Sequence, residues 1–293
     1  MALYVSTNIS SLNAGRQLGK ATHSLDTTYK RLSSGLRINS AKDDAAGLQI
    51  SNRLTAQING LNQGNRNAND GIALAQTAEG ALDEVTNMLQ RIRTLALQSA
   101  NGTNTTTDRT SLQSEVTQLS SEIARIACKT TFAGNSILAG AGKGLLDSNG
   151  KLSLQVGANA NDTVTVNLSV AFLLSKMQEV SSVSTKGLST DKKSFDVSTV
   201  CKAQNVLEGI DSYISFVDKK RGELGAVQNR LESTIANQSN IAENESDARS
   251  RIRDTDYAEE AANLSQQTIV QQAASSMLTQ ANSRPQIALS LLG

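Results

Sequence analysis

The sequence is poor in proline, cysteine and aromatic residues, and it has no tryptophan. Its 293 residues include one proline, two cysteines and 3% aromatic residues. With proline confined to Pro285, long helices can run almost anywhere, since proline breaks a helix by removing an N–H donor. Two cysteines without metal-ligand spacing exclude a disulfide scaffold. So few aromatic residues leave little material for a thick core, and a long, thin helical bundle needs less of it.

Long apolar runs and an excess of charge are also missing. No run of about 18 apolar residues occurs, so we expect no membrane-spanning segment. The N-terminal stretch MALYVSTNISSLNAGR has no basic region followed by an apolar core, which argues against an ordinary secretory signal peptide. By those criteria alone the protein would be cytoplasmic. A net charge of +1 leaves no surplus of Lys and Arg to neutralise phosphates, so we expect neither nucleic acid nor membrane as a partner.

The chain is organised around residues 72–100, where apolar residues recur at helical spacing. One seam contains Ala75, Ala78, Leu82, Val85, Leu89, Ile92 and Ala96. A second seam, at heptad spacing, contains Leu74, Ala81, Met88 and Leu95. Because each apolar stripe must be buried against something, two seams predict a helix with neighbours on more than one side. We expect it to be the middle of a bundle.

Two further helices are predicted to pack along this rod. The run NGTNTTTD after Ala100 is a turn signal, with Thr107 or Asp108 as the cap of the next helix. A second rod is predicted from about 197 to 253. Its heptad track contains Leu207, Ile210, Ile214, Val217, Leu224, Leu231, Ile235 and Ala242. It is interrupted by Arg221, Gln228 and Gln238, which we expect to fix the register.

A small β element is predicted between these helices, at about 145–170. Its alternating apolar residues and the turn at Asp147–Gly150 indicate a hairpin with an Asn-Gly turn, and another short strand from Val164 to Val170. Residues 181–198, which are rich in Ser, Thr and Lys, are predicted to form an exposed outer loop. The predicted fold class is therefore mainly α: a long antiparallel coiled-coil bundle with a small β-hairpin.

The two ends of the chain resemble each other in composition. Ser40 and Asp43 fit a capping box, which places a boundary near residue 42, and Pro285 is predicted to end the last helix. The seams at the two ends are rich in small residues. They contain Leu18, Leu25 and Leu32 at one end and Ile269, Ala273 and Met277 at the other, with Val270, Ala274 and Leu278 on the row beside the latter. Small side chains bury little surface, so we expect these helices to pair weakly and to bind other copies of the chain.

Several long stretches carry a family likeness. They are SLNAGRQLGKATHSLDTTYKRLSSGLRINSAKDDAAGLQISNRL, LQRIRTLALQSANGT, GAVQNRLESTIANQSNIAENESDARSRIRDTDYAEE and the tail ALSLLG. The chain resembles bacterial flagellin, the subunit of the flagellar filament, over residues 1–132 and about 200–293. QVGANANDT, at 155–163, resembles the β-hairpin of that family.

The resemblance implies a division of the chain and a route out of the cell. Residues 1–42 and 255–293 correspond to the two halves of an inner coiled-coil domain, and 43–254 to a rod domain. Flagellins are exported unfolded through the flagellar type III apparatus, which implies an extracellular location without a cleavable signal. The implied partners are other copies of the chain, an export chaperone, the filament cap and hook-junction proteins. A hook–filament junction protein and a secreted receptor-binding module are the alternatives; no cofactor is expected, and no enzyme.

The resemblance also implies recognition by host innate-immune receptors. Residues matching those that a Toll-like receptor contacts are Gln90, Arg91, Leu95, Gln98 and Glu115. The cytosolic inflammasome sensor is implied to bind the tail residues Leu289, Leu291 and Leu292. The competing interpretation is that Arg91 and Glu115 form ordinary rod contacts within the filament, whether or not a receptor also binds them. Thr163 and Thr165 are candidates for O-linked glycans, which are known in the family.

Two cysteines and a single histidine are the remaining residues whose role must be considered. The family usually lacks cysteine, so Cys128 and Cys201 are either introduced thiols, features of an unusual variant, or buried small residues. Each lies beside its helix seam rather than in it, which predicts at least partial exposure. His23 has no second histidine nearby, so a catalytic or metal-binding role is not expected.

Overall fold

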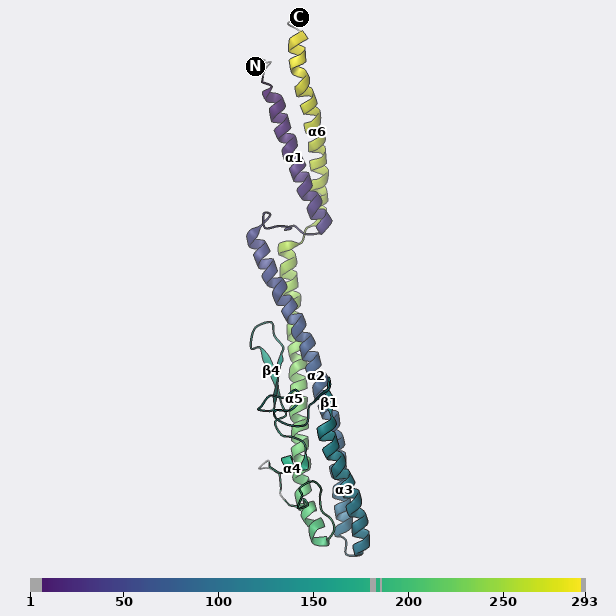
Figure 1. Cartoon of the computed structure of the whole chain (residues 1–293). Helices are drawn as coiled ribbons and strands as arrows, with labels where there is room; N and C mark the ends of the chain where they lie inside the picture. Colours follow the sequence, from purple (N-terminus) through teal and green to yellow (C-terminus); the bar gives the residue numbers. More distant parts are fainter. Residues whose placement is uncertain (1–6, 180–182, 185, 291–293) are drawn as a thin grey trace. The chain divides into compact units, whose positions relative to one another are not determined.

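The computed structural model describes residues 7–179, 183–184 and 186–290, with side chains described as far as Arg284. This part of the chain is mainly α-helical, as predicted (Figure 1). Its helices are α1 (Ile9–Ser34), α2 (Ala45–Ala100), α3 (Thr106–Lys129), α4 (Leu174–Met177), α5 (Val200–Arg253) and α6 (Tyr257–Ser290). Its strands are β1 (Thr131–Phe132), β2 (Asn135–Ser136), β3 (Lys151–Gln155) and β4 (Thr163–Asn167).

The chain divides into two compact units. Unit 1 consists of residues 1–58 and 243–293, and unit 2 of residues 59–242. Helices α2 and α5 contribute to both units, because their ends lie in unit 1 and their longer parts in unit 2. Each unit is described by itself below.

The core of unit 2 is built on the two predicted seams of α2. All seven residues of the first seam are fully buried, and in the second Leu74 and Leu95 are 3% and 1% exposed. Their neighbours come from α3 and α5, which include the buried Val116, Ile123 and Ile210. The prediction of a central helix with partners on two sides is confirmed.

The polar interruptions of the second rod bind the helix opposite. The Arg221 guanidinium lies 2.9 Å from a carboxylate oxygen of Asp83, and the Gln228 side-chain amide donates to Glu79 at 2.9 Å. Both partners belong to α2, and the residue numbers rise along one helix as they fall along the other. These polar contacts therefore pin one register of an antiparallel pair, as polar residues in coiled-coil seams do.

Helix α3 begins two or three residues earlier than the predicted caps imply. Its N-cap is Thr105, whose hydroxyl accepts from the Asp108 N–H at 3.3 Å, while the Asp108 carboxylate accepts from the Thr105 N–H at 2.8 Å. This reciprocal pair is a capping box. The choice of Thr107 or Asp108 as the cap was wrong because the run of threonines offers several hydroxyls, and only one stands three residues before a carboxylate.

We expect this cap to make the stability of α3 depend on pH. Hydrogen bonds from the Thr105 hydroxyl and backbone hold the pKa of Asp108 below its ordinary value. The carboxylate is favoured in the folded chain, so its contribution is complete above about pH 4, where the unfolded group ionises, and is lost as pH falls through the folded value. Urea unfolding should therefore find Asp108→Asn less stable than wild type at pH 7. The difference should shrink toward pH 3; a difference that stayed constant with pH would contradict the assignment.

The β-hairpin is real, but its turn is not the predicted one. Strands β3 and β4 pair antiparallel, with Leu152 opposite Val166, and residues 156–162 connect them. The predicted Asn-Gly turn instead leads into β3: the Gly150 N–H donates to the Asp147 carbonyl at 2.9 Å, and Gly150 has a φ of 71°. Leu146 before it is buried rather than paired. The stretch that resembles the family's hairpin, 155–163, contains the true connection.

Two features between α3 and α5 differ from the sequence prediction. β1 and β2 form an unpredicted two-residue hairpin around Ala133 and Gly134, which have φ angles of 49° and 82°. The region predicted as an exposed loop is anchored, because Phe195 and Val197 are fully buried and Phe195 contacts Tyr213 edge to face at 5.3 Å. Apolar residues among many Ser and Lys residues dock this loop on α5. Residues 180–182 and 185 lie outside the described residues.

The hairpin connection packs directly on α2, which is possible because α2 carries glycine there. A Cβ on Gly64 would lie 1.8 Å from the Val156 carbonyl oxygen, and one on Gly60 would lie 2.7 Å from the Ala158 Cβ. The same Val156 carbonyl accepts from the side-chain amide of Gln238 on α5 at 2.6 Å. Gln238, the third polar interruption of the α5 seam, thus binds the hairpin connection that packs on α2.

Gly64→Ala is expected to displace the hairpin and to destabilise unit 2 by about 1–3 kcal/mol, the usual cost of overpacking. Gly80 on the same helix is the matched control, because a Cβ there meets nothing within 4 Å. Gly80→Ala should stabilise the helix by about 0.5–1 kcal/mol through its better helix propensity. Chemical denaturation measures both changes. Equal stabilisation by the two substitutions would show that the hairpin does not pack at Gly64.

The start of α2 and the end of α6 also differ from expectation. Ser40 and Asp43 do hydrogen-bond, at 2.8 Å from the Ser40 N–H, but they close a turn before the helix. The cap of α2 is Asp44, which accepts from the Gly47 N–H at 2.9 Å. Pro285 does not end α6, which continues to Ser290, so the prediction of a helix end there was wrong.

Candidate functional site

The candidate functional site is the pair formed by α1 and α6 in unit 1. The two helices lie side by side and antiparallel (Figure 1). The Asn8 side-chain amide donates to the Ala281 carbonyl at 2.7 Å near one end of the pair. At the other end the Arg31 guanidinium lies 3.7 Å from the Glu260 carboxylate. Polar contacts hold both ends, so the strength of the pair depends on what is buried between them.

The seam of α1 faces α6 as predicted, but it is thin. Its buried residues are Ala21, Leu25 and Thr28, while Leu18 and Leu32 are half-buried. One leucine, one alanine and one threonine supply little apolar area for a helix of 26 residues. A helix of this kind gains little stability from its partner.

On α6 the structure places the predicted residues on the other side of the helix. Ile269 and Met277 are 66% and 65% exposed, and Ala273 is exposed as well. The residues toward α1 are Ala274 and Leu278, which are half-buried, and the buried Ala281. The sequence could not decide between these two rows, because Ala, Ser, Thr and Gln surround both of them.

The terminal pair therefore leaves large apolar side chains in solvent. Ile9 and Leu12 on α1 are each 67% exposed, close to the exposed fractions of Ile269 and Met277 on α6. Single exposed apolar residues are ordinary, but here four lie on two adjoining helices whose own contact is poorly filled. The pair has apolar surface for further helices to cover.

Short backbone contacts join the connectors at the base of the pair. Gly35 ends α1 in the left-handed conformation, with a φ of 71°, and its carbonyl accepts from the Thr255 N–H at 3.0 Å. The Arg37 N–H donates to the Arg253 carbonyl at 2.7 Å. These bonds keep the end of α1 beside the start of α6 in a single chain.

The residues of the predicted receptor surface are divided by the structure. Arg91 on α2 and Glu115 on α3 are exposed and form an ion pair at 2.8 Å, as the rod-contact interpretation expects. Gln90 and Gln98 are exposed on α2. Leu95 is 1% exposed and belongs to the core of unit 2. The folded rod therefore exposes the two glutamines, Arg91 and Glu115, and it buries Leu95.

The remaining predicted sites lie at the hairpin, at two helix ends and in the tail. On β4, Thr165 is exposed and Thr163 is half-buried. Cys128 and Cys201 are both exposed free thiols, so the prediction of exposure is confirmed and the alternative of buried small residues is wrong. Leu291 and Leu292 lie outside the described residues, as does the side chain of Leu289.

The described residues also bear on metals and membranes. Among them, no group of three or more His, Cys, Asp and Glu side chains is placed to hold a metal ion. None of the helices in the same described ranges is both long enough and apolar enough to span a bilayer.

Long antiparallel helices with an underfilled terminal pair define a class of protein: a helical coiled-coil protein whose terminal pair leaves apolar side chains uncovered. Comparison with known proteins agrees with this class. Residues 5–143 match the bacterial flagellin N-terminal helical region, and residues 207–292 match the bacterial flagellin C-terminal helical region. Flagellin B of Vibrio anguillarum is 39% identical to this chain, with both chains covered completely. The chain belongs to the bacterial flagellin family.

A second relative gives the same result. Flagellin D of Vibrio cholerae is also 39% identical, over 100% of both chains. That alignment extends over 377 positions against the 293 residues of this chain, so the relative carries residues that this chain lacks. The crystal structure of Bacillus cereus flagellin is 31% identical and covers 59% of this chain and 88% of its own, with a TM-score of 0.48.

Proposed function

We infer that the chain is a structural subunit that polymerises into the bacterial flagellar filament and serves swimming motility. Its role is mechanical, as expected of the family to which it belongs. The observation that carries the inference is the exposed apolar surface of the terminal pair, with Ile9, Leu12, Ile269 and Met277 each about two-thirds exposed. A single chain gains nothing from these side chains, whereas a neighbouring copy can bury them.

In this proposal the parts of the chain have different tasks. The segments 1–42 and 255–293 form the inner coiled coil, which becomes rigid as copies pack around it. Residues 43–254 form the rod, whose well-filled core around Leu82 and Leu89 gives stability before assembly. These different roles are supported by the packing of the two helices: α2 buries a complete apolar seam, whereas α1 buries three residues.

Substitutions on the outer face of α6 test the proposal. Ile269→Asp combined with Met277→Asp should abolish growth on filament fragments, because a charge cannot be buried between copies at low cost. The matched control, Ile269→Val with Met277→Leu, keeps the face apolar and should polymerise. Electron microscopy and sedimentation measure growth, and circular dichroism of the monomers checks folding. Equal growth by the charged and apolar variants would overturn the assignment of this face.

The proposal includes export and partners. The chain leaves the cell unfolded through the flagellar type III apparatus, and an export chaperone, the filament cap and hook-junction proteins handle it on the way to an extracellular filament. The underfilled terminal pair supports passage in an unfolded state, because little packing must be broken there. Pull-down from a flagellated cell, using the chain with and without residues 255–293, tests for the chaperone.

A second role, as a ligand of host innate-immune receptors, is favoured by one surface of the rod. Arg91, Glu115, Gln90 and Gln98 are exposed together on α2 and α3. Their charged and amide groups suit a polar partner surface. We propose Leu95 as a residue that supports this surface from the core, and Leu289, Leu291 and Leu292 as the segment bound by the cytosolic sensor. Arg91→Ala should lower receptor activation while leaving polymerisation intact, and unchanged activation would count against this role.

Glycosylation is proposed at Thr163 and Thr165. The hydroxyl of Thr165 stands on the exposed face of β4, which gives a transferase access; Thr163 is less accessible. Mass spectrometry of filaments from the native organism tests both positions.

A further inference from the structure

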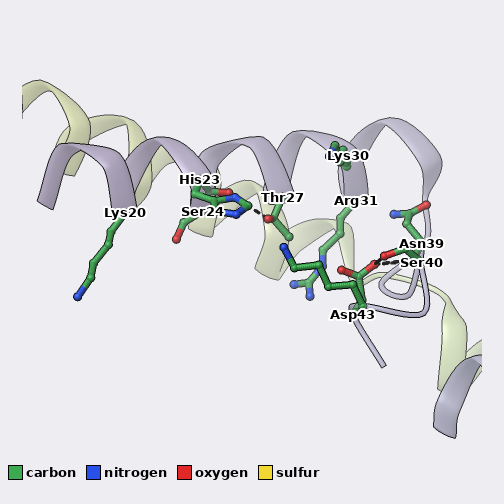
Figure 2. A pocket seen from close by; sticks show the side chains of 10 residues that line it. Lys20, His23, Ser24, Thr27, Lys30, Arg31, Asn39, Ser40 and Asp43 are labelled. Atoms are coloured by element: carbon green, nitrogen blue, oxygen red, sulfur yellow. Dashed lines mark hydrogen bonds between the residues drawn. The ribbon is translucent and has the colours of Figure 1, made fainter. Parts of the chain in front are cut away.

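A groove in unit 1 combines a concave shape with an excess of positive charge (Figure 2). It lies between α1 and the connector that follows it. Its lining includes the lysines Lys20, Lys30 and Lys42, together with Arg31 and a single carboxylate, Asp43. Figure 2 shows Arg31 from α1 close to Ser40 and Asp43 from the connector, with Lys20 further along the helix and Lys30 apart from this group. A groove of this composition suits a negatively charged occupant.

The groups inside the groove do not neutralise the lysines. Asp43 accepts hydrogen bonds from the N–H groups of Ser40 at 2.8 Å and Asn39 at 3.1 Å, and these donors lower its pKa. Arg31 is directed to Glu260, 3.7 Å away. Within the described part of the chain, no carboxylate lies at ion-pair distance from Lys20, Lys30 or Lys42. The three ammonium groups are the part of the groove left for an outside partner.

The same chain carries a matching negative surface. Asp254, Asp256 and Glu259, at the start of α6, are all exposed. None of the three forms an ion pair with another described residue, although Asp256 accepts from the Ala258 N–H at 2.8 Å as the cap of the helix. The net charge of the whole chain is only +1, so these two patches of opposite sign do not reflect an overall excess of either charge.

The Arg31 end of the groove adjoins the start of α6, where Arg31 pairs with Glu260, whereas Lys20 lies further along α1, near the contact of Thr22 with Gln271. Leu36, between α1 and Lys42, forms a backbone bridge with Asp254. Yet in one chain the carboxylates do not pair with the three lysines. Two copies packed side by side can bring the carboxylates of one against the groove of the other. A contact between two different patches of identical chains generates an open helical polymer when it does not close into a ring, whereas a self-complementary patch gives a closed dimer.

From this placement we propose that the lysine groove of one copy receives the carboxylates Asp254, Asp256 and Glu259 of the next copy. The inference rests on the proposed function as a filament subunit and names one contact within that polymer. The charge pairing fixes the register of neighbouring copies and speeds their docking, and the apolar surface of the terminal pair supplies most of the affinity. Growth should accordingly slow as ionic strength rises.

Charge reversal tests the contact. The groove variant carries Lys20→Glu and Lys42→Glu, and the carboxylate variant carries Asp254→Lys and Glu259→Lys. Asp256 and Glu260 are left unchanged because they cap α6 and pair with Arg31. Lys193→Glu, on an exposed loop residue of unit 2, is the control for a change of charge alone. Each monomer is added to wild-type filament fragments at low ionic strength, and elongation is followed by light scattering and electron microscopy.

Neither reversed variant should elongate alone at more than about a tenth of the wild-type rate, and Lys193→Glu should match wild type. A 1:1 mixture of the two variants should elongate, because the reversed groove of one meets the reversed carboxylates of the other. A third chain carries both reversals. If that chain elongates filaments but the 1:1 mixture does not, the contact lies within one copy, and the proposal is overturned. Elongation by both variants alone would also overturn it. If wild type itself fails to elongate, the filament function fails instead.

Discussion

Deletion of residues 255–293 is expected to abolish polymerisation completely while leaving unit 2 folded. The deletion removes α6, with its exposed Ile269 and Met277, and uncovers the thin seam of α1. The core of unit 2 lies within residues 59–242 and does not include the deleted segment. Sedimentation and electron microscopy with filament fragments should therefore find only monomers.

Circular dichroism supplies the control for this deletion. The helical signal should fall by no more than the shares of α1 and α6, and the unfolding midpoint of the remaining helices should stay close to that of the full chain. Filaments grown from the truncated chain would contradict the assembly role of α6. Loss of all cooperative unfolding would contradict the independence of unit 2.

Leu89→Ala is expected to destabilise unit 2 by about 2–5 kcal/mol, the usual cost of removing a buried leucine side chain. Leu89 is fully buried in the first seam of α2, where α3 and α5 pack on the rod. The neighbours are helices fixed by several polar contacts, such as the pair of Arg221 and Asp83, so they cannot collapse freely into the space. Urea unfolding of the monomer measures the change.

Leu97→Ala on the same helix is the matched control. Leu97 is 61% exposed, so its truncation should alter the stability of the monomer by no more than about 0.5 kcal/mol. Because both substitutions remove the same atoms from one helix, the difference between them isolates burial. Similar losses at the two positions would contradict the assignment of the α2 core.

The rods could be predicted from sequence because large and small residues contrast strongly along them. The spacing of Leu82, Val85, Leu89 and Ile92 defines one buried face, and the structure buries that face completely. Arg221 and Gln228 could likewise be recognised as register residues, because they interrupt an apolar heptad track. Periodicity is informative where the free energy of burial differs greatly between the faces of a helix.

Where that contrast is missing, the sequence left the choice open. Along α6 the rows through Ile269 and through Ala274 are separated by one residue, and each mixes apolar residues with Ala, Ser or Gln. The prediction therefore placed Ile269 in the seam, while the structure exposes it. The prediction of the hairpin turn was wrong for another reason. Asn149–Gly150 is a strong turn signal, and a turn does form there, closed by the Asp147 carbonyl, but it leads into β3 instead of joining two paired strands.

The candidate site was predictable in kind but not in detail. Weak seams at both ends indicated paired helices completed by other copies, and the resemblance to flagellins pointed the same way. The positive groove could not be found from sequence, because Lys20 and Lys42 come together only when the connector folds back beside α1. The role of Gly64 is similar, since its need for space appears only once the hairpin is docked.

Hydrogen exchange of the terminal helices, in the monomer and in the filament, tests the central claim most directly. If α1 and α6 are too sparsely packed to stand alone, their amides should exchange almost as fast as an unfolded chain in dilute monomer, while the amides of α2 around Leu89 stay protected. In the filament, α1 and α6 should become as protected as the rod. Strong protection of both terminal helices in the isolated monomer would contradict the claim.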